Sequence, residues 1–129
     1  MTRCALASIA LAVTLAAATS ASAQSPRKFP ANALRGEIVV VQPPDIAVNG
    51  DAARLAPGAR IYGMNNLLQM SASLVGPSMA VNYTLDNLGQ VALVWILTDE
   101  ERARKPWPTT LRQAQEWRFD PAAQVWSRP

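Results

Sequence analysis

The clearest pattern of apolar and polar positions lies in residues 78–98. Every second residue from Met79 to Leu85 is apolar, and the residues between them are small or polar. This period of two is typical of a strand with one buried face. After turn residues at 86–89, residues 91–97 are apolar at every position, which indicates a central strand covered on both faces. The pattern therefore predicts a β-hairpin in the second half of the chain.

A second hairpin is predicted around Asn49-Gly50. The apolar residues 46–48 precede this dipeptide, and residues 52–55 would form the returning arm. Asn-Gly suits a type I′ turn because both central residues of that turn need a positive φ.

Two further strands are predicted on either side of this second hairpin. Residues 37–42 are β-branched and apolar until two prolines interrupt them. Pro57-Gly58 predicts another turn, and a strand follows at 59–62. Residues 63–74 fit neither period, so we expect a turn near Asn65-Asn66 and then an irregular strand.

The last third of the chain predicts one short helix and a small hairpin. Thr98 is a good N-cap, and Glu101 occupies the position that completes a capping box. This helix would end before Pro106, where a proline-rich extended crossing begins. Within the tail, residues 109–129, Asp120-Pro121 predicts the turn of a hairpin.

Together these elements predict a mainly β protein. Its fold would be a small, partly open β-barrel of five to six short antiparallel strands, with one short helix and an aromatic C-terminal hairpin or tail. We expect a flexible N-terminal segment at 24–35, the barrel at 36–98, and the helix and aromatic tail packing on the barrel at 99–129. The predicted core consists of Ile38, Val40, Ile46, Val48, Leu55, Ile61, Val81, Tyr83, Leu93, Trp95 and Leu97.

Residues 1–23 have the features of a secretory signal peptide. Arg3 gives a short positive start, the fourteen residues 5–18 are apolar or small, and Ala21-Ser22-Ala23 matches the small-x-small cleavage pattern. A spanning helix needs about 20 apolar residues, so this run is too short for a membrane anchor. The sequence predicts export to the periplasm, or secretion, in a bacterium, with no transmembrane span after cleavage.

The composition of the mature chain excludes several kinds of chemistry. The one cysteine is Cys4, in the signal peptide, and there is no histidine. Disulfides, Ser-His-Asp and Cys-His catalysis, and the usual His/Cys zinc sites are therefore excluded. Removing Arg3 leaves 11 basic and 9 acidic residues, a net charge of +2, which gives no electrostatic argument for nucleic acid. No cofactor is predicted.

Two groups of carboxylates are candidates for a site. Asp99, Glu100 and Glu101 form the densest cluster, but acidic residues at a helix start are favoured by the helix dipole, so capping is preferred over catalysis or metal binding. Asp45 and Asp51 flank the Asn-Gly turn, where turn chemistry is preferred over calcium binding.

The tail aromatics are the remaining candidates for a contact surface. They are either a lid that docks on the barrel or a surface that binds a partner or glycan. We favour the lid for Trp117 and Phe119 and expect Trp107 to be more exposed. The possible partner or glycan contact residues are Trp107, Trp117, Trp126, Arg112 and Arg118.

About half of the chain carries a family resemblance, formed by turn glycines and strand valines. The residues are Gly36-x-Ile38-Val39, Val48-Asn49-Gly50, Leu55-x-Pro57-Gly58-x-Arg60-Ile61, Leu74-Val75-Gly76, Val81-x-Tyr83 and Gly89-x-Val91 leading to Trp95-Ile96-Leu97-Thr98. In these motifs the chain resembles the uncharacterised secreted small-β-barrel domains of proteobacterial envelopes. The resemblance implies a periplasmic protein of this fold and carries over no catalytic residue.

Two classes of function follow. The first is a non-enzymatic binding or structural module of the cell envelope, and the alternative is a module that binds oligosaccharide or peptidoglycan through the tail aromatics. A protein binder needs an apolar patch or an open strand edge. A glycan binder needs exposed aromatic rings in a groove, and an enzyme needs a concave site with perturbed carboxylates.

Overall fold

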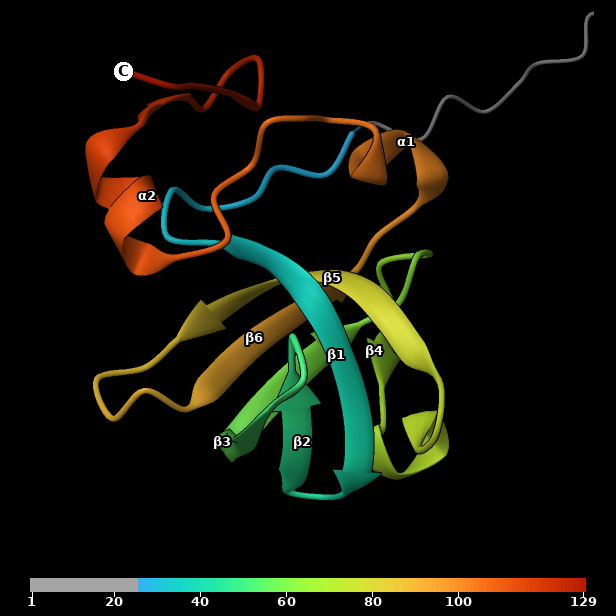
Figure 1. Ribbon diagram of the computed structural model, residues 1–129. Helices are drawn as coiled ribbons and strands as arrows, with labels where there is room; N and C mark the ends of the chain where they lie inside the picture. The colour runs from blue at the N-terminus through green and yellow to red at the C-terminus, as the bar shows by residue number, and fades with distance from the viewer. Residues whose placement is uncertain (1–25) are drawn as a thin grey trace, which may run out of the picture.

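A computed structural model describes residues 26–129, and five of its strands close into a barrel (Figure 1). Around the barrel the order is β1-β2-β3-β6-β5, and β5 returns to β1. These strands are β1 (Leu34–Gln42), β2 (Asp45–Val48), β3 (Asp51–Tyr62), β5 (Ser78–Leu85) and β6 (Val91–Ile96). The mainly β barrel is confirmed. It differs from the prediction in one pairing, because β3 and β6 run parallel while the other pairs are antiparallel.

The Asn49-Gly50 hairpin is confirmed as the connection between β2 and β3. Asn49 has φ 52° and Gly50 has φ 84°, the positive values that a type I′ turn requires. The register places Val48 opposite Asp51 across the turn. Local turn chemistry therefore sets the start of β3.

The turn predicted at Pro57-Gly58 is wrong, because β3 continues through it. Between Leu55 and Arg60 the pairing of β3 with β6 shifts in register, and Gly58 has φ 76°. These features form a β-bulge, which bends a strand instead of reversing it. The bend lets β3 pair with β2 through residues 51–54 and with β6 through residues 55–62, which closes the barrel.

The β5–β6 hairpin is also confirmed. In its turn, one carboxylate oxygen of Asp86 accepts hydrogen bonds from the backbone N–H groups of Leu88 and Gln90, both at 2.9 Å. Gly89 takes the positive φ of 76° that completes the turn. β6 lies between β5 and β3, as expected for a strand that is apolar on both faces.

The inside of the barrel holds one cluster of buried side chains. Most of the predicted core is there, with Val48 only partly buried. Leu93 is a wrong assignment, because Val91 and Val94 take the inward positions of β6. The cluster consists of Leu34, Ile38, Val40, Ile46, Leu55, Ile61, Val81, Tyr83, Val91 and Val94.

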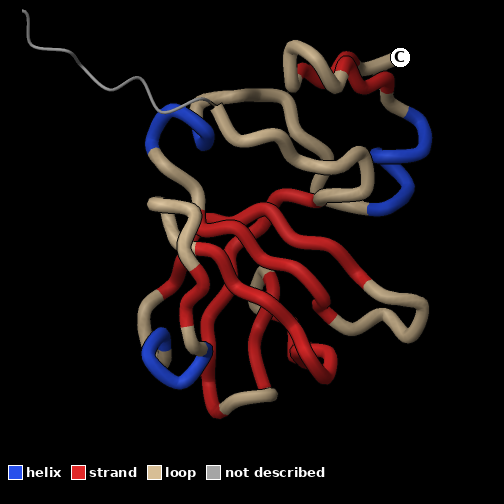
Figure 2. Tube along the Cα trace, turned by 180° about the vertical axis from the view of Figure 1, so that it is seen from behind, coloured by secondary structure: helices blue, strands red, loops and turns tan. Residues whose placement is uncertain are grey.

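A second cluster lies outside the barrel, beneath a layer that we call the cap. The cap comprises residues 26–33 and 97–129, and it covers one end of the barrel (Figures 1 and 2). Its elements are α1 (Asp99–Arg102), α2 (Leu111–Glu116), β7 (Arg118–Asp120) and β8 (Val125–Ser127). The buried members of the cluster are Phe29, Ala33, Leu97, Trp107 and Trp126, with Trp95, Trp117 and Phe119 packed against them.

Residues 24–35 were expected to form a flexible segment, but residues 26–33 pack into the cap and residues 34–35 begin β1. The ring of Phe29 is buried and meets Trp95 and Trp107 edge-on, with centroids 5.5 and 5.8 Å apart. The backbone N–H of Phe29 donates to Gln124 Oε1 at 2.8 Å. The start of the described chain is therefore tied to its last hairpin.

The helical elements agree with the prediction in part. Thr98 and Glu101 form the predicted capping box of α1. Helix α2, capped by Thr110, was not predicted, because none of its residues is buried and it therefore shows no apolar period.

Residues 63–74 form a turn, the two-residue strand β4 (Leu68–Gln69) paired with β3, and the 3₁₀ helix η1 (Ser71–Leu74). The predicted signal peptide lies outside the described residues.

Candidate functional site

Two of the predicted aromatic contact residues are buried. Trp107 is 5% exposed and Trp126 is 3% exposed, so the expectation of a more exposed Trp107 is wrong. The indole N–H of Trp107 donates to the carbonyl of Ala33 at 3.0 Å. Both rings meet each other edge-on, with centroids 6.1 Å apart, and stabilise the cap.

Trp117 and Phe119 lie at the border of the same cluster. Phe119 stacks on Trp126 at a centroid distance of 4.6 Å. Trp117 is half-buried, and the guanidinium of Arg128 lies 5.3 Å from the centre of its ring. Both side chains pack as the predicted lid would, although Trp117 keeps part of its surface in solvent.

The predicted arginine contacts, Arg112 and Arg118, do not join the tryptophans in one surface. Arg112 is exposed on α2 and pairs with Glu116 one helical turn away at 3.0 Å. Arg118 is exposed on β7. The structure therefore does not gather the five predicted contact residues into a single platform.

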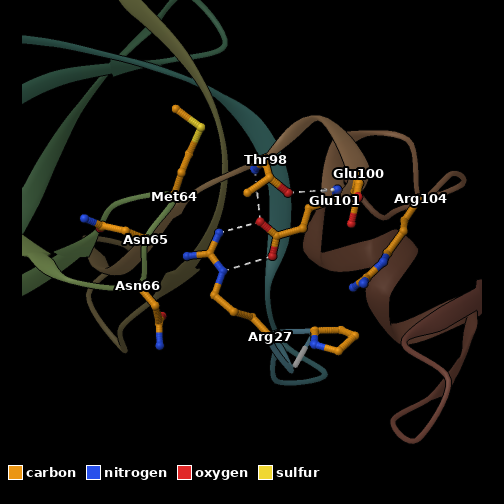
Figure 3. A pocket seen from close by; sticks show the side chains of 9 residues that line it. Arg27, Met64, Asn65, Asn66, Thr98, Glu100, Glu101 and Arg104 are labelled. Carbon is orange, nitrogen blue, oxygen red and sulfur yellow. Dashed lines mark hydrogen bonds and ion pairs between the residues drawn. The ribbon is translucent and has the colours of Figure 1, made fainter. Parts of the chain in front are cut away.

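The carboxylate cluster contains one buried member, Glu101. Its two oxygens face the guanidinium of Arg27 (Figure 3), at 3.0 Å from Nε and 2.5 Å from Nη2. Burial alone would raise the pKa of Glu101, but hydrogen bonds from Arg27 and from Thr98 outweigh it and lower the pKa below its ordinary value. Glu101 is thus held as an anion, which suits a structural ion pair and not a general acid.

A cavity of about 230 Å³ lies beside this ion pair (Figure 3). Met64, Asn65 and Asn66 line one side, and Glu100 and Arg104 belong to the other. Arg27 and Thr98 bind both oxygens of the buried carboxylate, so Glu101 offers no free carboxylate to the cavity. Among residues 26–129, no group of three or more Asp, Glu, His or Cys residues is placed to hold a metal ion.

Arg35 connects the barrel to the cap, a role that the sequence did not reveal. From β1 its guanidinium donates to the backbone carbonyls of Glu101 and Arg104, at 3.0 and 2.6 Å, and to Asn82 Oδ1 at 3.1 Å. It also lies 4.9 Å from the centre of a Trp107 ring. Burial lowers the pKa of Arg35 to about 10, and the charge of Arg104 adds to this effect against the opposing charge of Glu101.

An exposed apolar surface lies at the connection from β3 to β4, beside the cavity that Arg27 and Glu101 line. We call residues 63–70 the apolar hairpin; they connect β3 to β4 and continue through β4. Its four large apolar side chains are mostly in solvent: Met64 59%, Leu67 63%, Leu68 63% and Met70 77% exposed. Single exposed apolar residues are normal, but four within seven positions are not scattered.

The stretch of sequence that contains the apolar hairpin has no charged residue. From residue 61 to residue 85 there is no Asp, Glu, Lys or Arg. Soluble proteins usually carry charged side chains at an exposed strand edge, where these side chains block pairing with other chains. The hairpin itself therefore supplies no charge, and the charged residues beside it, Arg27, Glu100 and Arg104, come from the cap and lie next to Met64.

Strand β4 also leaves one edge of the sheet open. It stands last in the strand order and pairs only with β3, through Ile61 opposite Gln69 and Tyr62 opposite Leu68. The next bond runs from the N–H of Gly63 to the carbonyl of Leu67. Because bonded and non-bonded pairs alternate in an antiparallel ladder, the backbone groups of Leu68 point away from β3.

Comparisons of the chain with protein-family models, curated proteins and solved structures find no match. The resemblance to envelope barrel domains therefore stays a prediction. Within the described part of the chain, none of the helices has the length and apolar character to cross a membrane.

Proposed function

We propose that this chain is a non-enzymatic module, exported to the bacterial envelope, that binds a partner protein through the apolar hairpin. The observation that carries the proposal is the exposure of Met64, Leu67, Leu68 and Met70 beside an open strand edge. An apolar patch and an open edge are the two features that a protein-binding surface needs.

The chemistry of the hairpin defines the partner. Moving an exposed Leu or Met side chain out of water gains up to about 1.5–3 kcal/mol, so covering four of them supplies the driving force of a binding hot spot. Methionine adapts its shape to the surface that it meets. Because residues 61–85 are uncharged, the surface complementary to Leu67, Leu68 and Met70 is apolar, whereas charged residues of the cap border Met64. An extended segment of the partner would pair with Leu68 on the open edge.

A partner protein fits this surface better than a second copy of the chain. Strand β4 has two residues, so two such edges would form few ladder bonds with each other. A partner that supplies its own groove or strand makes up the difference.

The two other classes have less support. Glycan binding on a platform of tail tryptophans needs exposed rings, and Trp107 and Trp126 are buried. Acid–base catalysis of hydrolysis needs a carboxylate that is free to exchange a proton. In Glu101 both carboxylate oxygens accept hydrogen bonds from Arg27.

Photo-crosslinking in living cells tests the proposal. A photoreactive benzophenone amino acid replaces Leu68 in the apolar hairpin or, as the matched control, Leu88 in the β5–β6 turn, which is 83% exposed. We expect one discrete adduct with an envelope protein from position 68 and none from position 88. The same adducts from both positions, or none from either, would contradict the proposal. An adduct of twice the chain mass would assign the surface to a second copy instead.

A further inference from the structure

A small pocket lies at the junction of the barrel and the cap, away from the apolar hairpin. Its volume is about 300 Å³, the lower end of the range for small-molecule sites. It contains no residue of the hairpin at 63–70. The polar and aromatic residues that line it are Arg35, Lys105, Trp107, Thr109, Gln113, Trp117 and Arg128.

The charges in this pocket have one sign. Three of the lining residues are cations, from β1, from the segment after α1 and from the end of β8, and none is acidic. In the part of the chain that the structure describes, Lys105 and Arg128 have no carboxylate within 4.0 Å. The nearest acidic lining belongs to the adjoining groove, where Glu37 and Asp99 lie. Lys105 and Arg128 converge without a counter-ion, while Glu101 partly balances Arg35, so the pocket keeps a local potential that attracts an anion.

Arg35 supplies a fixed charge at the base of the pocket. Its donors are already bound to the carbonyls of Glu101 and Arg104, so it contributes charge and not free hydrogen bonds. Burial lowers its pKa to about 10, which means that its charged form is poorly solvated and gains from a nearby anion. Lys105 and Arg128 are exposed and keep donors available for a ligand.

The rest of the lining suits a hydroxylated ring. Gln113 Oε1 already accepts hydrogen bonds from the backbone N–H and the hydroxyl of Thr109, at 2.9 and 3.1 Å. This arrangement leaves the amide nitrogen of Gln113 as a donor. The half-buried indole of Trp117 provides an apolar wall, on which the apolar side of a sugar ring packs as it does on other aromatic residues.

We propose that this pocket binds one anionic sugar unit, with the acidic group between Lys105 and Arg128 and the ring against Trp117. The acidic group is a carboxylate or a phosphate. The site is independent of the apolar hairpin and would make the protein a two-site module of the envelope.

Binding of defined probes to the purified protein tests this inference. Glucuronate and glucose 6-phosphate carry the two kinds of acidic group, glucose carries neither, and inorganic phosphate lacks the ring. We expect at least one of the two anionic sugars to bind about tenfold more tightly than both glucose and phosphate, because hydrogen bonds to charged groups contribute this much. Calorimetry measures the affinities, and quenching of tryptophan fluorescence provides a second signal.

Three variants decide whether the pocket is the site. Lys105→Gln and Arg128→Gln each remove one cation, and we expect each to weaken binding of the preferred probe about tenfold with an unchanged melting temperature. Arg112→Gln is the control, because Arg112 is exposed on α2 and pairs with Glu116 outside the pocket. Equal binding of glucose and its anionic analogues, no binding of any probe, phosphate as tight as the sugars, or equal losses in all three variants would overturn the proposal.

Discussion

Single side chains, and not the secondary structure alone, hold the two layers of this protein together. Arg27 pairs with Glu101, and its Nη1 and Nη2 also donate to the carbonyls of Gly63 and Ile96, at 2.8 and 2.7 Å. The sequence predicted Glu101 as a capping residue, and this is confirmed. Its pairing with Arg27 could not be predicted, because 74 residues separate them and no local pattern reports such a distance.

The pH dependence of the free energy of unfolding tests how much the Glu101 carboxylate contributes to stability. Its pKa in the folded protein is lower than its ordinary value of 4.5, so its contribution is fully present above about pH 4.5 and is lost as the pH falls through the folded value. We expect the free energy of unfolding, measured in urea between pH 7 and pH 3, to decrease on acidification more steeply in the wild type than in Glu101→Gln.

Glu100→Gln is the matched control for this measurement, because Glu100 is exposed on the same helix turn. We expect its acid dependence to follow that of the wild type. Parallel curves for Glu101→Gln and the wild type would show that the ion pair with Arg27 does not contribute to stability.

At the scale of elements, local chemistry predicted the two hairpins and missed the features that depend on distant partners. Asn49-Gly50 and Asp86 form the expected turns because their own backbone and side chains determine them. Pro57-Gly58 looks like a turn in the sequence, but pairing of β3 with β6 makes it a bulge. The apolar hairpin could not be predicted as such, because the apolar residues at 63–74 fit neither the period of a strand nor that of a helix.

Substitutions at Gly50 test the turn between β2 and β3. Gly50 has φ 84°, and no atom within 4 Å would meet a Cβ, so backbone strain alone determines the outcome. We expect Gly50→Val to lower the free energy of unfolding by about 1–3 kcal/mol, and Gly50→Asn by distinctly less, because asparagine tolerates positive φ. Equal melting temperatures of the two variants would contradict the assigned turn.

At the scale of the whole molecule, one aromatic cluster joins the cap to the barrel, so we expect the two to unfold as one cooperative unit. Phe29 lies near the start of the described chain and packs on Trp95 of β6 and Trp107 of the cap. Its backbone N–H donates a hydrogen bond to the side chain of Gln124 in the last hairpin. The sequence predicted the barrel and an aromatic layer on it. It did not predict the place of Phe29 in that layer, because a lone aromatic among prolines has no periodic pattern.

The substitution Phe29→Ala tests this cooperativity. Deleting a buried aromatic ring costs about 3–5 kcal/mol, so we expect one unfolding transition at a clearly lower urea concentration. Leu88→Ala, at an 83% exposed position, serves as the control with an expected change within about 0.5 kcal/mol. Two separate transitions would show that the cap unfolds independently of the barrel, and an unchanged midpoint in Phe29→Ala would show that Phe29 does not stabilise the cap.

The central claim is that the apolar hairpin is kept for a partner protein and not for the fold. The double substitution Leu68→Ser with Met70→Ser tests it most directly, in cells that carry the photoreactive residue at position 67. Both side chains are mostly exposed, so we expect the free energy of unfolding to change by no more than about 0.5 kcal/mol per site while the partner adduct is lost. A large loss of stability, or an adduct that persists at full yield, would contradict the account.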